Sequence, residues 1–547
     1  MKLRIKKSFS CILLFSVYAS LYGSKTYAQL CPIVPKPISS RAAHAVFELS
    51  SQTFITYNDD SLQKAKDYLT NMLIKQYHWQ FPNKPIGKTK NKIVLRIVHS
   101  KKQKTTPESY TLSMSKDEVH IQSSSFKGII HGVNSLLQLV YLGTSSADST
   151  KVQTACWNIK DAPRYGWRSF MLDESRHFFG KQTVKTILDV MALYKLNKFH
   201  WHLTDETGWR IQINQYPLLT SIGATGDFDN PKKTARYYTQ SDIREIVAYA
   251  SERGIDIVPE IDMPGHASAA VRAYPIVDGG GSDKHPNFTF NPGLDTTYTF
   301  LTNILKEVAA LFPSKMIHIG GDEVSFGNEK WTHDSAITVL KKEKNLASNL
   351  DVEHYFIHRM ADSVKRLGCK VLGWDELADT DLDKGNTVLF WWRHDHPEQV
   401  KKMIEKGYPF VACPRLPFYF DFVQTERDKV GRRWDKKYNP IENVYSFTLD
   451  STIGNASLLG VQAAAWTEQI ASVKRLHYMT FPRLLAMAEN AWTPKETLDF
   501  SDFSTRMDSQ MRILGAMGVY YYDFLCLDNT PEVVDSERDL QYLDNAK

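Results

Sequence analysis

Carboxylates, histidines and tryptophans gather at the ends of short apolar runs in the second part of the sequence. Indole faces pack against the C–H surface of a pyranose ring, while carboxylates and arginines take its hydroxyls in hydrogen bonds. A single acid at such a position could be a solvated cap, but acids recur at nearly all of them. The pattern therefore favours a carbohydrate site. The run ends in question are residues 172–177, 200–206, 259–266, 318–323, 373–376, 391–393, 418–421 and 465–468.

The most informative acids are the neighbours Asp322 and Glu323, which follow His-Ile-Gly-Gly. Most retaining glycosidases use two carboxyl groups about 5–5.5 Å apart, one of them as nucleophile, but some rely on a group of the substrate instead. Neighbouring side chains at a strand end diverge and can address different atoms of one sugar. The adjacent pair therefore suits the substrate-assisted exception.

Eight short apolar or β-rich runs carry these side chains, and eight is the number of strands in a closed parallel barrel. Amphipathic helical segments separate several of the runs. Gly254, Gly368 and Gly407 come just after such segments, where glycine can adopt the left-handed conformation that ends a helix. The sequence thus predicts an α/β fold with a (β/α)8 TIM barrel, whose active site lies at the C-terminal ends of the strands. The predicted strands are residues 169–173, 198–205, 256–262, 316–322, 370–375, 387–392, 409–413 and 460–466.

Two further parts are expected to flank the barrel. Residues 29–160 mix strand-like and helical runs and predict a smaller α+β domain without obvious chemistry. The barrel is assigned residues 161–500, with a long loop at 424–452 and a helix at 476–492. Residues 501–547 are expected to add a helix, at 503–517, and an acidic tail that pack on the barrel.

Residues 1–28 read as a secretory signal peptide, because a basic start is followed by a short apolar stretch and small residues. The stretch is shorter than the roughly 18 apolar residues of a membrane span. We therefore expect a secreted or periplasmic protein without a transmembrane span. Five of the positive charges behind the formal +6 lie in this segment, which has no acid, so the remainder is near +1. A net charge this close to zero gives no indication of the basic surface that binds nucleic acid.

The five later cysteines are widely spaced without a CxxC pattern, so we expect free thiols rather than disulfides or a zinc site. His200 and His202 could be mistaken for a zinc pair, but they alternate along a strand around an indole. Because the sequence shows no third ligand to complete an open site, packing is the preferred interpretation. No metal and no cofactor are expected.

Two motifs make the chain resemble a known family. Residues 197–210, Asn-Lys-Phe-His-Trp-His-Leu-Thr-Asp-Glu-Thr-Gly-Trp-Arg, and 318–324, His-Ile-Gly-Gly-Asp-Glu-Val, are similar to those of the β-N-acetylhexosaminidases of glycoside hydrolase family 20. The similarity runs from about Val34 to Pro494. It implies an exo-acting retaining enzyme that removes terminal β-linked GlcNAc, with GalNAc as an alternative, from oligosaccharides or glycoconjugates.

The resemblance also implies roles for individual residues. Glu323 would protonate the glycosidic oxygen and later activate water. Asp322 would hold the acetamido N–H while the acetamido oxygen forms an oxazolinium intermediate, and Tyr419 would hold that oxygen. His266 and Asp205 would form a chain of hydrogen bonds leading to Glu323. The expected sugar-binding residues are Arg168 for the 3- and 4-hydroxyls, Trp374, Trp392 and Trp466 around the acetamido group, and Asp421 and Glu468 for the 4- and 6-hydroxyls.

Two departures from the family pattern concern the pocket shape or the leaving-group side: Asp-Glu-Thr at 205–207 instead of Asp-Asp-Gln, and Phe420 instead of leucine. The Trp391-Trp392 doublet leaves two candidates for the sugar wall, and we choose Trp392 because it precedes an arginine as in the family.

Three alternatives stay open at this point. One is a carbohydrate-binding barrel without turnover, because fold does not imply function. Another is a retaining barrel glycosidase with a protein nucleophile, for example Glu260 or Glu376 acting with Glu323. The weakest is a metal-dependent hydrolase. A homodimer is as compatible with the sequence as a monomer.

Overall fold

The computed structural model describes residues 30–82, 91–98, 106–147, 149–449, 457–534 and 543–544 of the chain. The expected signal peptide at residues 1–28 lies outside the described residues. Residues 31–547 form one compact unit. In the part of the chain that the structure describes, no helix has both the length and the apolar character needed to cross a bilayer.

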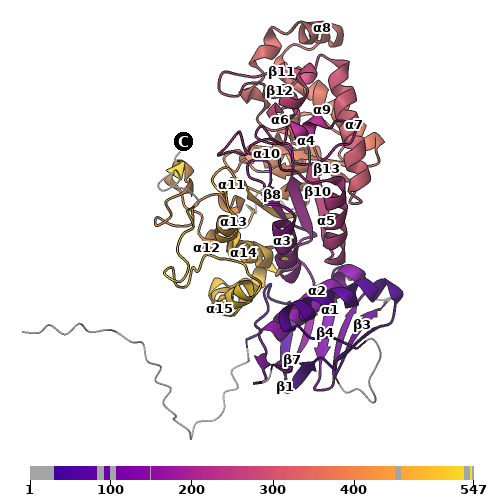
Figure 1. Ribbon diagram of the computed structural model, residues 1–547, viewed down its shortest axis with the longest axis vertical. Helices are drawn as coiled ribbons and strands as arrows, with labels where there is room; N and C mark the ends of the chain where they lie inside the picture. The colour runs from indigo at the N-terminus through magenta and orange to yellow at the C-terminus, as the bar shows by residue number, and fades with distance from the viewer. Residues whose placement is uncertain are drawn as a thin grey trace, which may run out of the picture. The chain divides into compact units, whose positions relative to one another are not determined.

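A closed barrel of eight parallel strands forms the larger part of this unit (Figure 1). Neighbouring strands pair in sequence order, and the last strand pairs with the first, which confirms the predicted (β/α)8 barrel. Nearly all strand residues are buried, as expected where helices cover the outside and side chains fill the inside. The strands are β8 (Trp167–Asp173), β9 (Lys198–His202), β10 (Asp256–Glu260), β13 (Met316–His318), β14 (Lys370–Trp374), β15 (Thr387–Trp391), β16 (Phe410–Ala412) and β18 (Leu458–Ala465).

Helices connect these strands and cover the barrel. The glycines predicted as helix ends adopt the left-handed conformation, with φ of 71° at Gly254, 71° at Gly368 and 77° at Gly407, directly before strands β10, β14 and β16. The main connecting helices are α3 (Lys181–Leu193), α5 (Gln240–Glu252), α7 (Asp295–Leu311), α9 (Asn349–Arg366) and α10 (Pro397–Lys406). Shorter helices are α4 (Leu218–Ser221), α6 (Ser268–Ala273), α8 (Ser335–Lys344), α11 (Arg415–Phe418) and α12 (Ile441–Tyr445).

A mixed sheet with two helices precedes the barrel, as the α+β pattern predicts. The helices pack on the sheet, and α2 also contacts α3 of the barrel. The sheet order is β1-β7-β4-β5-β3-β2, with the short β6 (Thr144–Ser145) beside β7. The strands are β1 (Ser39–Ser50), β2 (Phe54–Tyr57), β3 (Lys92–Ile97), β4 (Tyr110–Met114), β5 (Glu118–Ser123) and β7 (Lys151–Asp161), and the helices are α1 (Gln63–Tyr77) and α2 (Phe126–Tyr141).

The helix expected at 476–492 is two helices, α13 (Val473–Thr480) and α14 (Arg483–Trp492). Pro482 ends the first helix because proline has no N–H to continue its hydrogen bonds. Helix α14 packs on β18 and β8, where the barrel closes, and α15 (Phe500–Ala516) follows. Small strand pairs complete the fold: β11 (Asp278–Gly280) with β12 (Thr289–Phe290), and β17 (Gly431–Arg432) in the long loop with β19 (Leu543–Asp544) near the C-terminus.

Candidate active site

Three tryptophans and a tyrosine form a buried cage at the C-terminal ends of the strands. The ring centroids of Trp374 and Trp466 are 6.0 Å apart, and those of Tyr419 and Trp466 are also 6.0 Å apart. Trp392 lies parallel to Tyr419, with 6.4 Å between the centroids and 7° between the planes. Trp391 packs instead in the outer core, so Trp392 is the member of the doublet that faces the cage. All four cage residues are therefore placed together as the sequence predicts.

The acid pair stands on an irregular turn after β13. Gly320 and Gly321 have φ of 67° and 90°, and a Cβ on Gly320 would lie 1.7 Å from a carboxylate oxygen of Asp262. Glycine is therefore required at this position. Glu323 itself has φ of 54°, and His266 has φ of 52°. A left-handed backbone at a residue other than glycine lowers stability by roughly 1–3 kcal/mol. It persists where the surrounding packing holds it in place, which is typical of functional sites.

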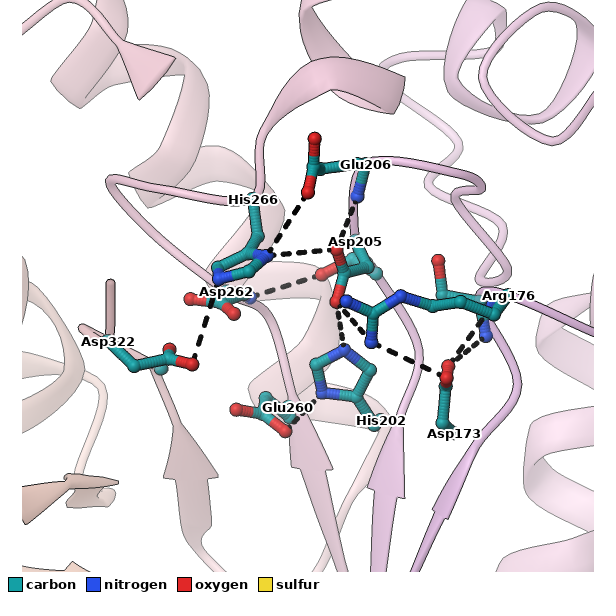
Figure 2. A network of polar contacts seen from close by, with 12 residues as sticks. Asp173, Arg176, His202, Asp205, Glu206, Glu260, Asp262, His266 and Asp322 are labelled. Atoms are coloured by element: carbon teal, nitrogen blue, oxygen red, sulfur yellow. Dashed lines mark hydrogen bonds and ion pairs between the residues drawn. The ribbon is translucent and has the colours of Figure 1, made fainter. Parts of the chain in front are cut away.

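His266 lies between Asp205 and Asp322 (Figure 2), and it also approaches Glu323. Its Nε2 lies 3.7 Å from Asp322 Oδ2 and 3.6 Å from Glu323 Oε2. On the other side, its Nδ1 donates to Asp205 Oδ1 at 3.0 Å. Burial disfavours the charged imidazole, but the surrounding carboxylates of Asp205, Asp322 and Asp262 raise the pKa of His266 well above its ordinary value. The histidine is thus a charged bridge between Asp205 and the acid pair.

The chain of hydrogen bonds continues below Asp205 into the barrel. His202 Nε2 donates to Asp205 Oδ2 at 2.8 Å, and His202 Nδ1 donates to Glu260. Burial opposes the charged form, yet the charges of Glu260 and Asp205 raise the pKa of His202 well above its usual range. Glu260 also accepts from Trp374 Nε1 at 3.0 Å and contacts His318 Nδ1 at 2.8 Å. Alternating charges therefore connect the wall of the cage with the acid pair.

Asp322 shares its surroundings with Asp262, which lies two residues after the end of β10. Burial, with the charges of Glu323 and Glu260, raises the pKa of Asp322 to about 7, although His266 acts in the opposite direction. Burial and the charge of Asp322 raise the pKa of Asp262 well above its ordinary value. Because two buried carboxylates this close cannot both ionise at low cost, the pair as a whole favours retaining one proton. Asp262 is a site residue that the sequence analysis missed.

Arg168, expected to bind hydroxyls, does not belong to the site. It lies near the start of β8, at the opposite end from the cage, and its side chain is 1% exposed. Its Nη1 and Nη2 pair with Glu108 at 2.9 and 3.0 Å, and its Nε donates to the Lys195 carbonyl at 2.8 Å. The prediction for Arg168 is therefore wrong. This arginine fastens the N-terminal domain to the bottom of the barrel.

Arg176 is the arginine that the structure places at the cage. It follows the C-terminal end of β8, with Nη1 2.8 Å from Asp205 Oδ2 and 3.4 Å from Asp173 Oδ2. Its guanidinium carbon lies 5.2 Å from the ring centroid of Trp466. The signal was present in the sequence, because the run Leu-Asp-Glu-Ser-Arg-His ends at the rim, where barrel enzymes place catalytic and binding residues.

Asp421 and Glu468, the two acids expected to bind hydroxyls, lie around one arginine. Arg432 of β17 contacts both, with Nε 3.1 Å from Asp421 Oδ2 and Nη2 3.2 Å from Glu468 Oε1. Burial and the charge of Glu468 raise the pKa of Asp421 to about 6 despite this arginine. Burial acts the same way on Glu468, but Arg176 and Arg432 lower the pKa of that carboxyl. The long loop therefore contributes a basic residue to this corner of the site.

The two departures from the family pattern have separate positions. Glu206 faces the rim, with one oxygen 3.9 Å from His266 Nδ1 and the other 3.3 Å from His285 Nδ1. Phe420 points away from the cage into the outer core, under the guanidinium of Arg483 at 4.8 Å. Of these two residues, only Glu206 thus lies next to His266, the histidine that contacts the acid pair.

Several buried polar atoms around the cage have no hydrogen-bond partner among the described residues. Such atoms are costly unless a ligand or water satisfies them. They belong to residues that the resemblance assigns to catalysis or to sugar binding, which is the arrangement of a pocket prepared for a hydroxyl-rich ring. They are Asp322 Oδ1, His266 Nε2, Trp466 Nε1, Glu468 Oε2 and Asp421 Oδ1.

Glu260 and Glu376, the alternative nucleophiles, accept hydrogen bonds from other side chains of the protein. Glu260 is completely buried beneath Trp374, and both of its oxygens contact imidazole or indole N–H groups. Glu376 accepts from Trp392 Nε1 at 3.1 Å. Neither oxygen of Glu260 is free to attack a sugar in the cage, and Glu376 supports the cage wall from behind.

Histidines and acids also bring metal-ligand atoms together. The sequence shows no third ligand for the pair His200 and His202, but in the structure Glu260 lies next to both histidines, and His318 joins His200 and Glu260. In that group the Glu260 oxygens are already taken by hydrogen bonds, so hydrogen bonding accounts for the cluster. The groups whose ligand atoms lie within 4.8 Å of one another among the described residues are His200, Glu260 and His318; His202, Asp205 and Asp262; Asp205, Glu206 and His266; and Asp262, His266 and Asp322.

Comparisons with known proteins agree with this geometry. Residues 165–495 match the family model "Glycosyl hydrolase family 20, catalytic domain", and residues 30–162 match "Glycosyl hydrolase family 20, domain 2". The chain is 33% identical to the beta-hexosaminidase of Vibrio furnissii over 487 residues, which cover 85% of this chain and 77% of that relative. It is 31% identical to the beta-hexosaminidase of Porphyromonas gingivalis over 508 residues, and the match spans 90% of this chain but 64% of that relative.

A solved structure gives the same result. The GH20 exo beta-N-acetylglucosaminidase of Vibrio harveyi in complex with N-acetylglucosamine superposes with a TM-score of 0.80 at 30% identity, over 93% of this chain and 81% of the other. The catalytic-domain match alone covers more than half of the sequence. The chain therefore belongs to glycosyl hydrolase family 20.

Proposed function

We propose that this protein is an exo-acting retaining β-N-acetylhexosaminidase that removes terminal β-linked GlcNAc, and GalNAc as an alternative, from oligosaccharides or glycoconjugates. The observation that carries the proposal is the buried cage of Trp374, Trp392 and Trp466 with the acid pair at its edge. A cage closed on its inner side by Glu260 and His318 admits one terminal sugar ring rather than an internal segment of a chain. The matches to beta-hexosaminidases support the same assignment.

In the proposed mechanism Glu323, whose side chain is 31% exposed, protonates the leaving oxygen at the mouth of the cage. Asp322, more deeply buried, accepts the acetamido N–H, and the acetamido oxygen attacks the anomeric carbon. Tyr419 donates to that oxygen; burial raises the pKa of its hydroxyl well above the ordinary value, so it keeps its proton. Glu323 then takes a proton from the water that opens the oxazolinium ring.

His266, Asp205 and Arg176 act on this machinery without reacting themselves. We assign His266 the task of holding positive charge beside both acids, and Asp205 the task of orienting it. Arg176 takes over the role that the sequence gave to Arg168 and binds ring hydroxyls together with Asp421 and Glu468.

The experiment that tests the proposal compares aryl β-glycosides. Aryl β-GlcNAc should be hydrolysed far faster than the otherwise identical β-glucoside, because only the former carries the attacking group. A thiazoline analogue of the cyclic intermediate should inhibit far more tightly than GlcNAc, as transition-state-like ligands do. Comparable rates on both glycosides, or a sugar trapped covalently on a side chain, would favour a protein nucleophile and overturn the mechanism.

We further propose that residues 1–28 are cleaved and that the enzyme is secreted or periplasmic. The basic start and the short apolar stretch of the sequence support this. Sequencing the N-terminus of the protein from its native host should find Gln29 as the first residue, and an intact Met1 start would contradict it.

The two arginines provide a matched prediction. Arg176→Lys should lower kcat/KM on aryl β-GlcNAc by roughly 10- to 100-fold, because hydrogen bonds to charged groups contribute roughly 1.5–3 kcal/mol. Arg168→Lys should leave kcat/KM within about twofold but lower the melting temperature, since it disturbs a buried pair that no ligand touches. Steady-state kinetics and thermal unfolding of both variants test this. The reverse pattern would restore Arg168 to the site.

A further inference from the structure

A second cleft opens beside the acid pair, on the outer side of the cage. It has a volume of about 360 Å³ and lies between the loop after β13, the first turns of α9, and helices α10 and α11. Glu323 and Trp392 belong to its lining and also to the edge of the cage. Because Glu323 is the proposed acid, the cleft begins where the leaving oxygen of a bound glycoside would be.

Three buried polar atoms of this cleft have no hydrogen-bond partner among the described residues: Gln399 Oε1, Arg393 Nη2 and Arg415 Nε. Gln399 comes from α10 and is only 8% exposed. Buried donors and acceptors without partners are uncommon in native proteins, since each costs free energy. Two donors and one acceptor belong to residues that line the same cavity. They suit a ligand with hydroxyl groups, because a hydroxyl can both donate and accept a hydrogen bond.

Each of the two arginines that line the cleft already pairs with an acid beside it. Arg393 Nε pairs with Asp375 at 2.7 Å, and Arg415 Nη2 pairs with Asp395. The acid Glu353 on α9 forms no ion pair with the residues that the structure describes, and burial raises its pKa to about 7. An added carboxylate would therefore meet arginines that are already neutralised and a carboxyl group that itself resists ionisation.

From these observations we propose that this cleft binds the leaving part of the substrate, a neutral sugar attached to the terminal N-acetylhexosamine. Gln399 accepts from one of its hydroxyls, and Arg393 and Arg415 donate to others. The inference rests on the proposed function, since it assumes that the cage holds the terminal sugar. It extends that function by naming the class of leaving group: a neutral hexose or hexosamine rather than a uronic acid.

The test compares Gln399→Met with wild type on two substrates that share the terminal sugar. On a disaccharide of two β-linked GlcNAc units, kcat/KM should fall about fivefold to tenfold, as expected for a lost hydrogen bond. On methyl β-GlcNAc, which has no second sugar, kcat/KM should stay within about twofold. Lys401→Met, on the exposed side of the same helix, is the matched control and should leave both unchanged.

A wild-type measurement tests the charge argument independently of any variant. GlcNAc β-linked to glucose should be cleaved at least about tenfold more efficiently than GlcNAc in the same linkage to glucuronate, because the uronate adds an uncompensated charge. Equal efficiency on the two, or a Gln399→Met effect of the same size on the methyl glycoside and the disaccharide, would overturn the inference. If wild type cleaves neither the methyl glycoside nor the disaccharide, the proposed function itself fails.

Discussion

Replacing Glu323 by glutamine is expected to remove most turnover of glycosides with poor leaving groups while leaving substrate affinity nearly intact. Glutamine keeps the shape of the side chain but cannot transfer a proton, and general acid catalysis contributes roughly 10²- to 10⁴-fold. Glycosides with acidic aryl leaving groups need little protonation, so their first step should be much less affected. Pre-steady-state rates of glycosylation over a series of aryl β-GlcNAc substrates measure this dependence directly.

The matched control for this variant is Glu329→Gln. Glu329 begins the short helical turn six residues further along the same loop and is exposed. It should show wild-type rates throughout the series. An equal loss in Glu323→Gln on good and poor leaving groups at the glycosylation step would remove Glu323 from the acid role.

The barrel could be predicted from the sequence because its signals are local. Each strand is a short apolar run, each helix has a regular apolar face, and the glycines at the helix ends need a left-handed backbone. The observed strands therefore fall within or next to the expected runs, as in 370–375 for β14 (Lys370–Trp374). Periodicity did not reveal the break at Pro482, since the apolar pattern continues across it.

The site could be predicted where one rule applied, namely that barrel enzymes carry their site residues at the C-terminal ends of the strands. Acids and tryptophans at strand ends lie at the rim, and the structure brings them together there. Arg168 was assigned by resemblance against this rule, since it lies near the start of its strand, whereas Arg176 satisfies the rule. The position of Arg168 is explained by a contact between the N-terminal domain and the barrel, because its guanidinium pairs with Glu108. No local sequence pattern indicates such a pairing.

The network beneath the acid pair could not be deduced from sequence in the same way. Glu260, His202 and His318 come from different strands, and only the register of the barrel places their side chains in one layer. Likewise, the left-handed backbone of Glu323 and His266 depends on the packing around them. The pairing of distant strands and the strained backbone at these two residues depend on tertiary contacts, which a local sequence pattern does not determine.

Asp322 is the residue whose replacement separates substrate assistance most sharply from a protein nucleophile. In the free site its pKa is raised to about 7, mainly by burial, with its charge stabilised by His266. As positive charge grows on the acetamido nitrogen, the N–H hydrogen bond to this carboxylate strengthens. Asp322→Asn should therefore reduce turnover by about two to three orders of magnitude, the loss typical of a preorganised group that acts on developing charge.

The dependence on the substrate provides the decisive measurement for Asp322→Asn. When the acetamido group is made less nucleophilic by successive fluorination, glycosylation by the wild type should slow steeply. Glycosylation by Asp322→Asn, already deprived of assistance, should show a shallower slope. Asp262→Asn is the matched control: because burial and the charge of Asp322 raise the pKa of Asp262 well above its ordinary value, an uncharged amide suits its place, and this variant should keep the steep slope. A flat wild-type profile would mean that the acetamido oxygen is not the nucleophile, whatever the fate of the variants.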